Sequence, residues 1–245
     1  VGLSLVALDD SSGSTAGKGK RLLKARPVAV QQISGSGLRA PAARTSFGQQ
    51  QGLHATADPL ALKSAVALVV DQDTREVLLS KNSAAVLPIA SITKLMTALV
   101  VKEAKQPLDE ILTIGEDDVD TEKGSRSRLA VGTRLSRSEM LHLALMSSEN
   151  RSAHALGRHY AGGLDAFVAA MNAQARLLGM HDTRYVDPTG LSSHNQSTAR
   201  DLALLVDEAY QHPLLRKYST AIETTVPLDR RQVQFRTTNG LVPNP

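Results

Sequence analysis

The chain has 245 residues, 42% of them hydrophobic, and its 28 basic and 24 acidic side chains give a formal net charge of +4 at pH 7. It contains no cysteine, which excludes a disulfide scaffold, a thiolate zinc site and a cysteine nucleophile. The excess positive charge lies in residues 1–60, so the neutral remainder gives no reason to expect a nucleic-acid partner.

Residues 1–60 are rich in Ser, Gly, Ala and Gln and show no sustained apolar period, which predicts a disordered basic lead-in. Its apolar start, residues 1–8, is interpreted either as a signal-peptide remnant or as the beginning of a tail. Gly35, Gly37 and Ala40 match a dinucleotide-binding pattern, but Pro41 follows where that site needs a helix. No apolar run reaches the roughly 18 residues of a transmembrane helix. We therefore expect no cofactor and no transmembrane segment.

Regular patterns begin at residue 65 and continue to the end of the chain. Residues 65–71 and 76–81 predict an antiparallel hairpin, because two apolar runs flank a short polar turn. Apolar periodicity and capping residues predict helices over residues 91–104, 136–146, 150–160, 164–178 and 199–210. Strand-like segments return at 223–228 and 233–236. A short β start, a long helical middle and a β return predict an α+β fold, with residues 61–245 as one domain.

The most specific local pattern is Ser91-Ile-Thr-Lys94 at the start of the first predicted helix. A lysine three residues after a serine on a helix lies one turn away, where its amine can approach the hydroxyl. This helix is apolar nearly all round, so burial is expected to lower the pKa of Lys94 and make it a base for a Ser91 nucleophile. Backbone N–H groups of the first turn would stabilise an oxyanion. The alternative is that Ser91 caps the helix and Lys94 lies at the surface.

A second polar triplet, Ser148-Glu149-Asn150, lies at the tight junction of two predicted helices. There Ser148 would pass a proton to a leaving amine, and Asn150 would hold a substrate amide or orient Lys94. Ser-x-Asn also occurs at Ser80 and at Ser193, so position and not pattern favours this triplet. The alternative is that Ser148 and Asn150 only cap the following helix.

Three segments carry a resemblance to a known family: PIASITKLMTALVV (88–101), LHLALMSSENRSAHALGR (141–158) and VDPTGLSSHNQSTARDLALL (186–205). Together they resemble the low-molecular-mass penicillin-binding proteins, and most of all the penicillin-binding protein 7-like DD-endopeptidases. The resemblance implies a β-lactamase/DD-peptidase-like fold and a periplasmic serine peptidase that cleaves D-alanyl-D-alanine bonds of peptidoglycan stem peptides. It implies Ser91 as the acylated nucleophile, Lys94 as the general base, Ser148 as the proton shuttle and Asn150 as a substrate-binding amide. It also implies covalent inhibition by β-lactam antibiotics.

Two features depart from the superfamily pattern. No Glu-x-x-Leu-Asn segment supplies the deacylating carboxylate of β-lactamases, which favours a peptidase over a β-lactamase. Lys-Thr-Gly does not occur in the 245 residues, so we expect a C-terminally incomplete family member that lacks later sheet strands and leaves an apolar edge on its hairpin. A non-catalytic wall-binding protein on the same fold is therefore a second alternative.

The acidic run 116–122 (EDDVDTE) does not fit a calcium loop, since Lys123 and Leu129 stand where an EF-hand needs Gly and Glu. A solvated loop is the expectation there. The histidines form no i, i+4 pair, so the sequence predicts no metal site.

Overall fold

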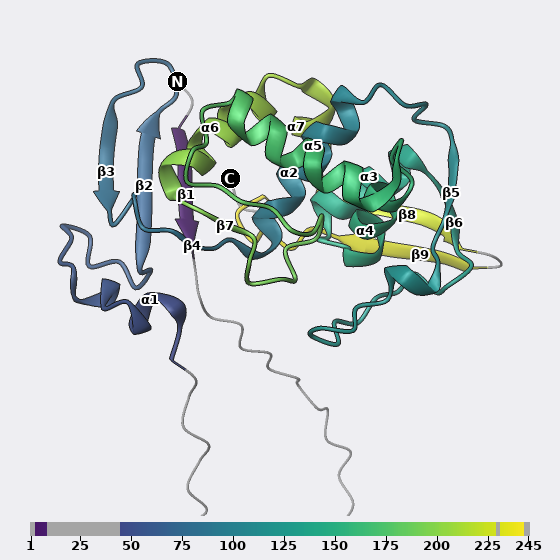
Figure 1. The fold of residues 1–245 in the computed structure, drawn as a ribbon, viewed down its shortest axis with the longest axis horizontal. Coiled ribbons are helices and arrows are strands. Elements are labelled where there is room, and N and C mark those ends of the chain that lie inside the picture. The colour runs from purple at the N-terminus through teal and green to yellow at the C-terminus, as the bar shows by residue number, and fades with distance from the viewer. Residues whose placement is uncertain (1–2, 9–44, 229–230, 243–245) are drawn as a thin grey trace, which may run out of the picture.

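The structure is a computed structural model that describes residues 3–8, 45–228 and 231–242. A three-stranded sheet lies at one side of a helical body, and a two-stranded hairpin lies at the other (Figure 1). The helices are α1 (Phe47–Gln50), α2 (Thr93–Glu103), α3 (Arg137–Met146), α4 (Asn150–Arg158), α5 (Gly163–Leu177), α6 (Ala199–Tyr210) and α7 (Pro213–Ser219). The 3-10 turns are η1 (Leu53–Ala55), η2 (Ala90–Ile92) and η3 (Glu116–Asp118). The strands are β1 (Leu3–Leu8), β2 (Val66–Asp71), β3 (Val77–Lys81), β4 (Leu87–Pro88), β5 (Ile111–Thr113), β6 (Arg134–Ser136), β7 (Gln196–Ser197), β8 (Glu223–Leu228) and β9 (Arg231–Arg236).

The predicted hairpin of β2 and β3 is confirmed, and it gains a third strand. β1 pairs antiparallel with β2 along its whole length, from Leu3 opposite Asp71 to Leu8 opposite Val66. The expectation of an unpaired lead-in is therefore wrong for residues 3–8. The physical reason is that backbone N–H and C=O groups at the edge of β2 need partners, and an apolar segment of matching length supplies them. Of the two strands of the predicted hairpin, β3 keeps an edge without a neighbouring strand among the described residues, and its Val77 and Leu78 are exposed.

A second described part of the predicted disordered lead-in, around α1, also has regular structure. Ser46 caps the short helix α1 through a capping box with Gln49, so residues 46–50 also have regular structure. The dinucleotide-like glycines, Gly35 and Gly37, lie outside the described residues. The division of the chain at residue 60 stays a prediction.

The helix α2 forms the centre of the fold, as its all-round apolar pattern predicted. Its buried side chains contact α3, α4, α5 and α6, which surround it. Its apolar members belong to one cluster of buried side chains that extends from Ala65 in front of β2 to Phe235 in β9. Because this helix is enclosed, any polar group that it carries must find its partners inside the protein.

The surrounding helices begin where their capping residues predicted. Ser136 and Glu139 form the expected capping box of α3, and Thr198 accepts from the N–H of Asp201 at the start of α6. A short loop connects α3 to α4 and holds Ser148 and Glu149, and Asn150 begins α4.

Helix α7 and the pairing of β5 with β6 were not predicted. Helix α7 begins at Pro213, whose fixed φ suits a first helical position, and was missed because it has only seven residues. β5 pairs with β6 in a second small ribbon. The hairpin of β8 and β9 confirms the predicted β return, and the N–H of Thr238 beyond it donates to the carbonyl of Met146 in α3.

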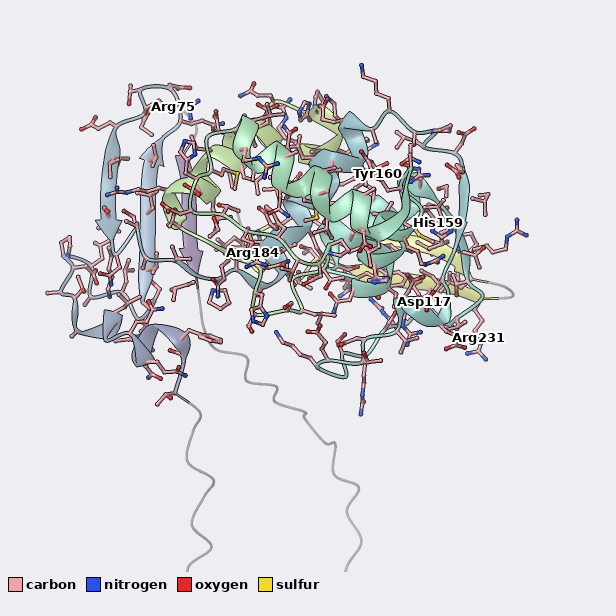
Figure 2. The ribbon with its side chains drawn as sticks, in the orientation of Figure 1. Arg75, Asp117, His159, Tyr160, Arg184 and Arg231 are labelled. Atoms are coloured by element: carbon pink, nitrogen blue, oxygen red, sulfur yellow. The ribbon has the colours of Figure 1, made fainter. Side chains whose placement is uncertain are left out.

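Arg75 lies in the turn between β2 and β3 (Figure 2). It forms an ion pair with Asp207 of α6, which joins this turn to the helical body. The described part of the chain contains no helix that is both long and apolar enough to cross a bilayer.

Candidate active site

Ser91 lies in η2, immediately ahead of α2. The cap position of α2 is Ile92 and no side chain caps this helix, so Ser91 is not the capping residue of the alternative interpretation. The preceding residue, Ala90, has φ 45°, a left-handed conformation that costs energy for a residue with a Cβ. The strained turn leaves Ser91 exposed at the start of an otherwise buried helix.

Lys94 does not extend to the surface, because only 2% of the residue is exposed. Its Nζ donates to Ser91 Oγ at 3.2 Å, to Asn150 Oδ1 at 2.7 Å and to the Thr189 carbonyl oxygen at 2.7 Å. An ammonium has three N–H donors, so these three acceptors use all of them. The amine is thus held on three sides by oxygens from three separate parts of the chain.

The environment of Lys94 differs from that of Lys81, another buried lysine. Lys81 Nζ forms an ion pair with Asp58 at 2.8 Å. Among the described residues, the hydrogen-bond acceptors of Lys94 are all uncharged oxygens. Burial lowers the pKa of Lys94 from 10.5 to about 8, against the opposing effect of the negative charges of Asp187 and Glu149.

The contacts of Lys94 determine where a lone pair would point. When the amine loses one proton, two N–H groups remain, and the oxygens of Asn150 and Thr189 can only accept. The Ser91 hydroxyl is the one neighbour among the three that can donate. The lone pair of neutral Lys94 is therefore directed at Ser91, in the geometry of a general base.

Ser148 lies between α3 and α4 with φ 56°, another left-handed position. The cap of α4 is Glu149, whose side chain accepts from the N–H of Arg151, so the interpretation of Ser148 and Asn150 as mere caps is wrong. Ser148 borders the same cavity as Ser91 and Lys94, with a volume of about 370 Å³. The structure brings these residues around one space without a hydrogen bond between Ser148 and Lys94.

Asn150 is the first residue of α4, and its side-chain amide is held at both ends. Its Oδ1 accepts from Lys94, and its Nδ2 donates to Ser125 Oγ at 2.9 Å. The structure therefore places Asn150 against Lys94, which was one of its two expected roles. Ser125 was not identified from the sequence, because a serine in an exposed loop gives no periodic or motif signal.

The third acceptor, the Thr189 carbonyl, belongs to the loop at the start of the family-like segment 186–205. Asp187 Oδ1 accepts from the N–H and hydroxyl of Thr189 and from the N–H of Gly190, which closes a tight turn around this carbonyl. A backbone oxygen has no residue-specific signature, so sequence reasoning could not assign it to Lys94.

The same loop also fixes the strained turn that contains Ser91. Gly190 has φ 81°, and a Cβ at this position would lie 1.8 Å from the Ala90 carbonyl oxygen. Asn195 is fully buried, accepts from the N–H groups of Val186 and Asp187, and donates to Thr93 Oγ1 at 3.0 Å. The loop and the start of α2 therefore form one rigid unit.

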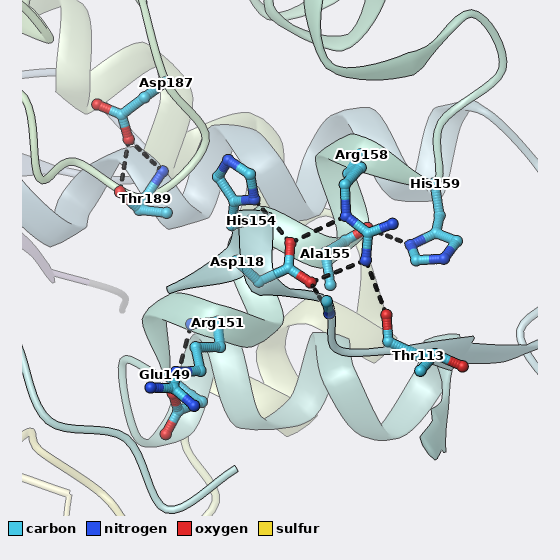
Figure 3. A network of polar contacts seen from close by, with 11 residues as sticks. Thr113, Asp118, Glu149, Arg151, His154, Ala155, Arg158, His159, Asp187 and Thr189 are labelled. Carbon is cyan, nitrogen blue, oxygen red and sulfur yellow. Dashed lines mark hydrogen bonds and ion pairs between the residues drawn. The ribbon is translucent and has the colours of Figure 1, made fainter. Parts of the chain in front are cut away.

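The acidic run is not simply a solvated loop, which corrects the expectation for Asp118. Its side chain is 0% exposed and binds His154 Nδ1 at 2.7 Å and Arg158 Nη2 at 2.8 Å on the outer face of α4 (Figure 3). Burial alone would raise the pKa of Asp118, but the hydrogen bonds from His154 and Arg158 lower it to about 2. This carboxylate anchors the loop after β5 to the helix that begins with Asn150.

In the described part of the chain, no group of three or more His, Asp or Glu side chains is arranged to hold a metal ion.

The chain matches a known protein family and several curated proteins. The family described as D-alanyl-D-alanine carboxypeptidase matches residues 53–244. The chain is 54% identical over 185 residues to a D-alanyl-D-alanine endopeptidase of Pseudomonas aeruginosa, covering 75% of this chain and 60% of that protein. It is 48% identical over 189 residues to a D-alanyl-D-alanine endopeptidase of Escherichia coli, covering 76% of this chain and 61% of that protein. The chain thus spans about 60% of the length of these curated relatives.

Solved structures confirm the expected fold. The Streptomyces K15 DD-transpeptidase superposes with a TM-score of 0.65 at 26% identity, over 71% of this chain and 72% of that chain. A D-alanyl-D-alanine carboxypeptidase of Mycobacterium tuberculosis gives a TM-score of 0.66 at 26% identity, over 73% of this chain and 68% of that chain. The α+β architecture is therefore that of the DD-peptidases, and with the family match the chain belongs to the D-alanyl-D-alanine carboxypeptidase family.

Proposed function

We propose that the chain acts as a serine-type D-alanyl-D-alanine peptidase on peptidoglycan stem peptides in the periplasm. The observation that carries the proposal is the contact between the amine of Lys94 and the exposed hydroxyl of Ser91. The amine is buried, and its hydrogen-bond acceptors among the described residues are uncharged oxygens. Lysine needs a lowered pKa to serve as a base near neutral pH, and the enclosed position of α2 supplies the lowering.

In the proposed acylation step, neutral Lys94 takes the hydroxyl proton as Ser91 Oγ attacks the carbonyl carbon of the scissile D-alanyl bond. The carbonyl oxygen becomes an oxyanion, and the backbone N–H of Ser91 at the helix start is one donor to it. The C–N bond then breaks, and the proton passes from Lys94 through Ser148 to the leaving amine. Water subsequently attacks the acyl-Ser91 ester and releases the second product.

Asn150 has a double role in this proposal. Its Oδ1 holds one N–H of Lys94, and one of its two Nδ2 donors is used by Ser125. The remaining donor is assigned to a carbonyl of the substrate peptide, which combines the two roles expected from the sequence.

Endopeptidase action on peptide cross-links is favoured over carboxypeptidase action because the relatives from Pseudomonas aeruginosa and Escherichia coli are D-alanyl-D-alanine endopeptidases. Because β-lactams present a reactive amide carbonyl to an acylating serine, they are proposed as covalent inhibitors. Because the proposed substrate is the wall polymer, a role in cell-wall biogenesis and cell shape is proposed as a consequence of its cleavage.

Incubation with a fluorescent penicillin tests the proposal. Stable labelling of the wild-type chain that disappears in Ser91→Ala supports it. Ser193→Ala is the matched control, since Ser193 belongs to another Ser-x-Asn triplet and is expected to leave labelling unchanged. Rapid release of hydrolysed drug would indicate a β-lactamase instead. No labelling of a folded chain would indicate a non-catalytic wall-binding protein and overturn the catalytic proposal.

A further inference from the structure

A continuous line of hydrogen bonds leads from Lys94 away from Ser91 into the acidic loop. Lys94 Nζ lies 2.7 Å from Asn150 Oδ1, and Asn150 Nδ2 lies 2.9 Å from Ser125 Oγ. The Ser125 backbone N–H in turn donates to Asp120 Oδ2 at 2.6 Å, and the N–H groups of Glu122 and Lys123 donate to Asp120 Oδ1 at 2.9 Å. Lys94, Asn150 and Ser125 are thereby connected in series, and the carboxylate of Asp120 holds the turn that carries Ser125.

The carboxylate of Asp120 gives the series a direction. It only accepts hydrogen bonds, and the Ser125 side chain lies close enough to lower the pKa of Asp120, so the negative charge attracts the Ser125 hydroxyl proton. The lone pairs of Ser125 Oγ are then left to accept from the NH2 end of Asn150. The opposite end of that amide, its carbonyl oxygen, consequently faces Lys94.

Without this direction the Asn150 amide has two orientations of nearly equal shape. A rotation by half a turn would present NH2 to Lys94: the protonated amine would then face another donor and make no hydrogen bond, and the neutral amine would direct its lone pair at Asn150 instead of Ser91. Lys94 would then lose one of the two fixed acceptors that leave its lone pair pointing at Ser91. The orientation of a single amide thus controls the geometry of the base.

The charge state of Asp120 suits this task. Partial burial alone would raise the pKa of Asp120, but hydrogen bonds from the Ser125 side chain and from the backbone N–H groups of Lys123, Ser125 and Glu122 lower it to about 2. The carboxylate is therefore ionised, and acceptor-only, throughout the pH range in which Lys94 titrates.

The loop is held against α4 at a second point, which keeps the series in register. Asp118 binds His154 and Arg158, which lie on α4 one turn and two turns beyond Asn150 (Figure 3). The loop thus meets the same helix through Ser125 at its start and through Asp118 farther along. Such a two-point attachment restricts sliding of the loop relative to Asn150.

We infer that Asp120 and Ser125 are positioning residues of the active site, which orient the Asn150 amide so that its oxygen, and not its nitrogen, faces Lys94. This inference rests on the proposed acyl-transfer function for its kinetic consequence. Neither residue touches the reacting atoms, so both act through Asn150. The other charged groups that influence Lys94 are Glu149 and Asp187, and the substitutions below leave both in place.

The test compares three variants by the pH dependence of penicillin acylation. In Ser125→Ala and in Asp120→Asn the plateau of the acylation rate at high pH is expected to fall about 10- to 100-fold, because the lone pair of Lys94 no longer points at Ser91. The pH midpoint of the acylation rate is expected to fall as well, because the Lys94 ammonium loses an acceptor. Ser125→Thr keeps the hydroxyl and is expected to restore both values.

Asp117→Asn is the matched control for charge. Asp117 is an exposed member of the same loop (Figure 2), and its substitution removes the same charge without touching the hydrogen-bond series. It is expected to leave plateau and midpoint at the wild-type values. If Asp117→Asn produced the same changes as Asp120→Asn, or if Ser125→Ala left both values unchanged, the inference would be overturned.

A substrate-free measurement separates this inference from the proposed function. In protein labelled with carbon-13 lysine, the Cε resonance that is missing in Lys94→Ala reports the titration of Lys94. Its midpoint is expected to decrease in Ser125→Ala and Asp120→Asn and to stay constant in Asp117→Asn. Absence of labelling in the wild type would refute the function, whereas an unchanged Lys94 midpoint in both positioning variants would refute the orientation of Asn150.

Discussion

Lys94 Nζ lies 3.2 Å from Ser91 Oγ, and the amine is bound to uncharged oxygens on its other sides. The environment of Lys94 differs in this respect from that of Lys81, whose amine is neutralised by an ion pair with Asp58. A buried amine without a carboxylate partner is costly as an ammonium, and that cost is what makes it a competent base.

Replacement of Lys94 tests this relationship directly. Lys94→Met is expected to lower the rate of Ser91 acylation by about two to four orders of magnitude, because the base is lost while a side chain of similar length remains. Stopped-flow acylation by a fluorescent penicillin measures the rate. The control is Lys81→Met, which removes the other buried amine and is expected to reduce stability but not acylation. Equal acylation rates in Lys94→Met and wild type would exclude Lys94 as the base.

The acylation rate is expected to rise with pH and to level off above about pH 8, where Lys94 becomes neutral.

The same lowered pKa of Lys94 affects the free energy of unfolding. Below about pH 8 the amine is protonated in both states, whereas between about 8 and 10.5 the unfolded chain binds more protons, so the free energy of unfolding increases with pH.

Urea unfolding of wild type and Lys94→Met at several pH values isolates this contribution to stability. The wild type is expected to gain stability relative to the variant between pH 8 and 10, and a constant difference across that range would contradict the lowered pKa.

Gly190 provides a test of the rigid unit behind Ser91. Gly190→Ala places a Cβ 1.8 Å from the Ala90 carbonyl oxygen, so it is expected to destabilise the fold and to lower acylation about tenfold or more by displacing Ser91. The control is Gly179→Ala at φ 78°, where no atom lies within 4 Å of the added Cβ. That change is expected to cost only about 1 to 2 kcal/mol of backbone strain and no acylation. Thermal unfolding and acylation, measured on both variants, distinguish strain from displacement.

Asp118 is predicted to stabilise the attachment of the acidic loop to α4. Asp118→Asn is expected to reduce the free energy of unfolding by about 1 to 3 kcal/mol, because hydrogen-bond partners in Arg158 and His154 lose a charged acceptor. Since the folded pKa is lowered to about 2 from 3.8, this contribution is present above about pH 3.8 and is lost as the pH falls through 2. Denaturant unfolding between pH 2 and 6 measures it, with Asp117→Asn as the neighbouring control; equal stability of the two variants would argue against the anchor.

The sequence by itself determined the pair of Ser91 and Lys94, the burial of α2 and the α+β order of elements. These features are local: a spacing of three residues on a helix, an apolar surface all round it, and capping residues such as Ser136 fix them before any long-range contact forms. The family segments were likewise visible as continuous stretches of residues.

The groups that contact the amine, and those behind them, could be identified only from the tertiary structure. Asn150 and Thr189 contact Lys94, and Ser125 and Asp120 lie behind Asn150, yet no periodicity in the sequence connects these segments. The contact from Thr189 is a backbone carbonyl, which has no signature in the sequence. The pairing of β1 with β2 is likewise a contact between distant segments that no pattern in the sequence indicates. Hydrogen-bond partners across distant segments are chosen by three-dimensional packing, since a buried polar group takes whichever acceptor the fold places within reach.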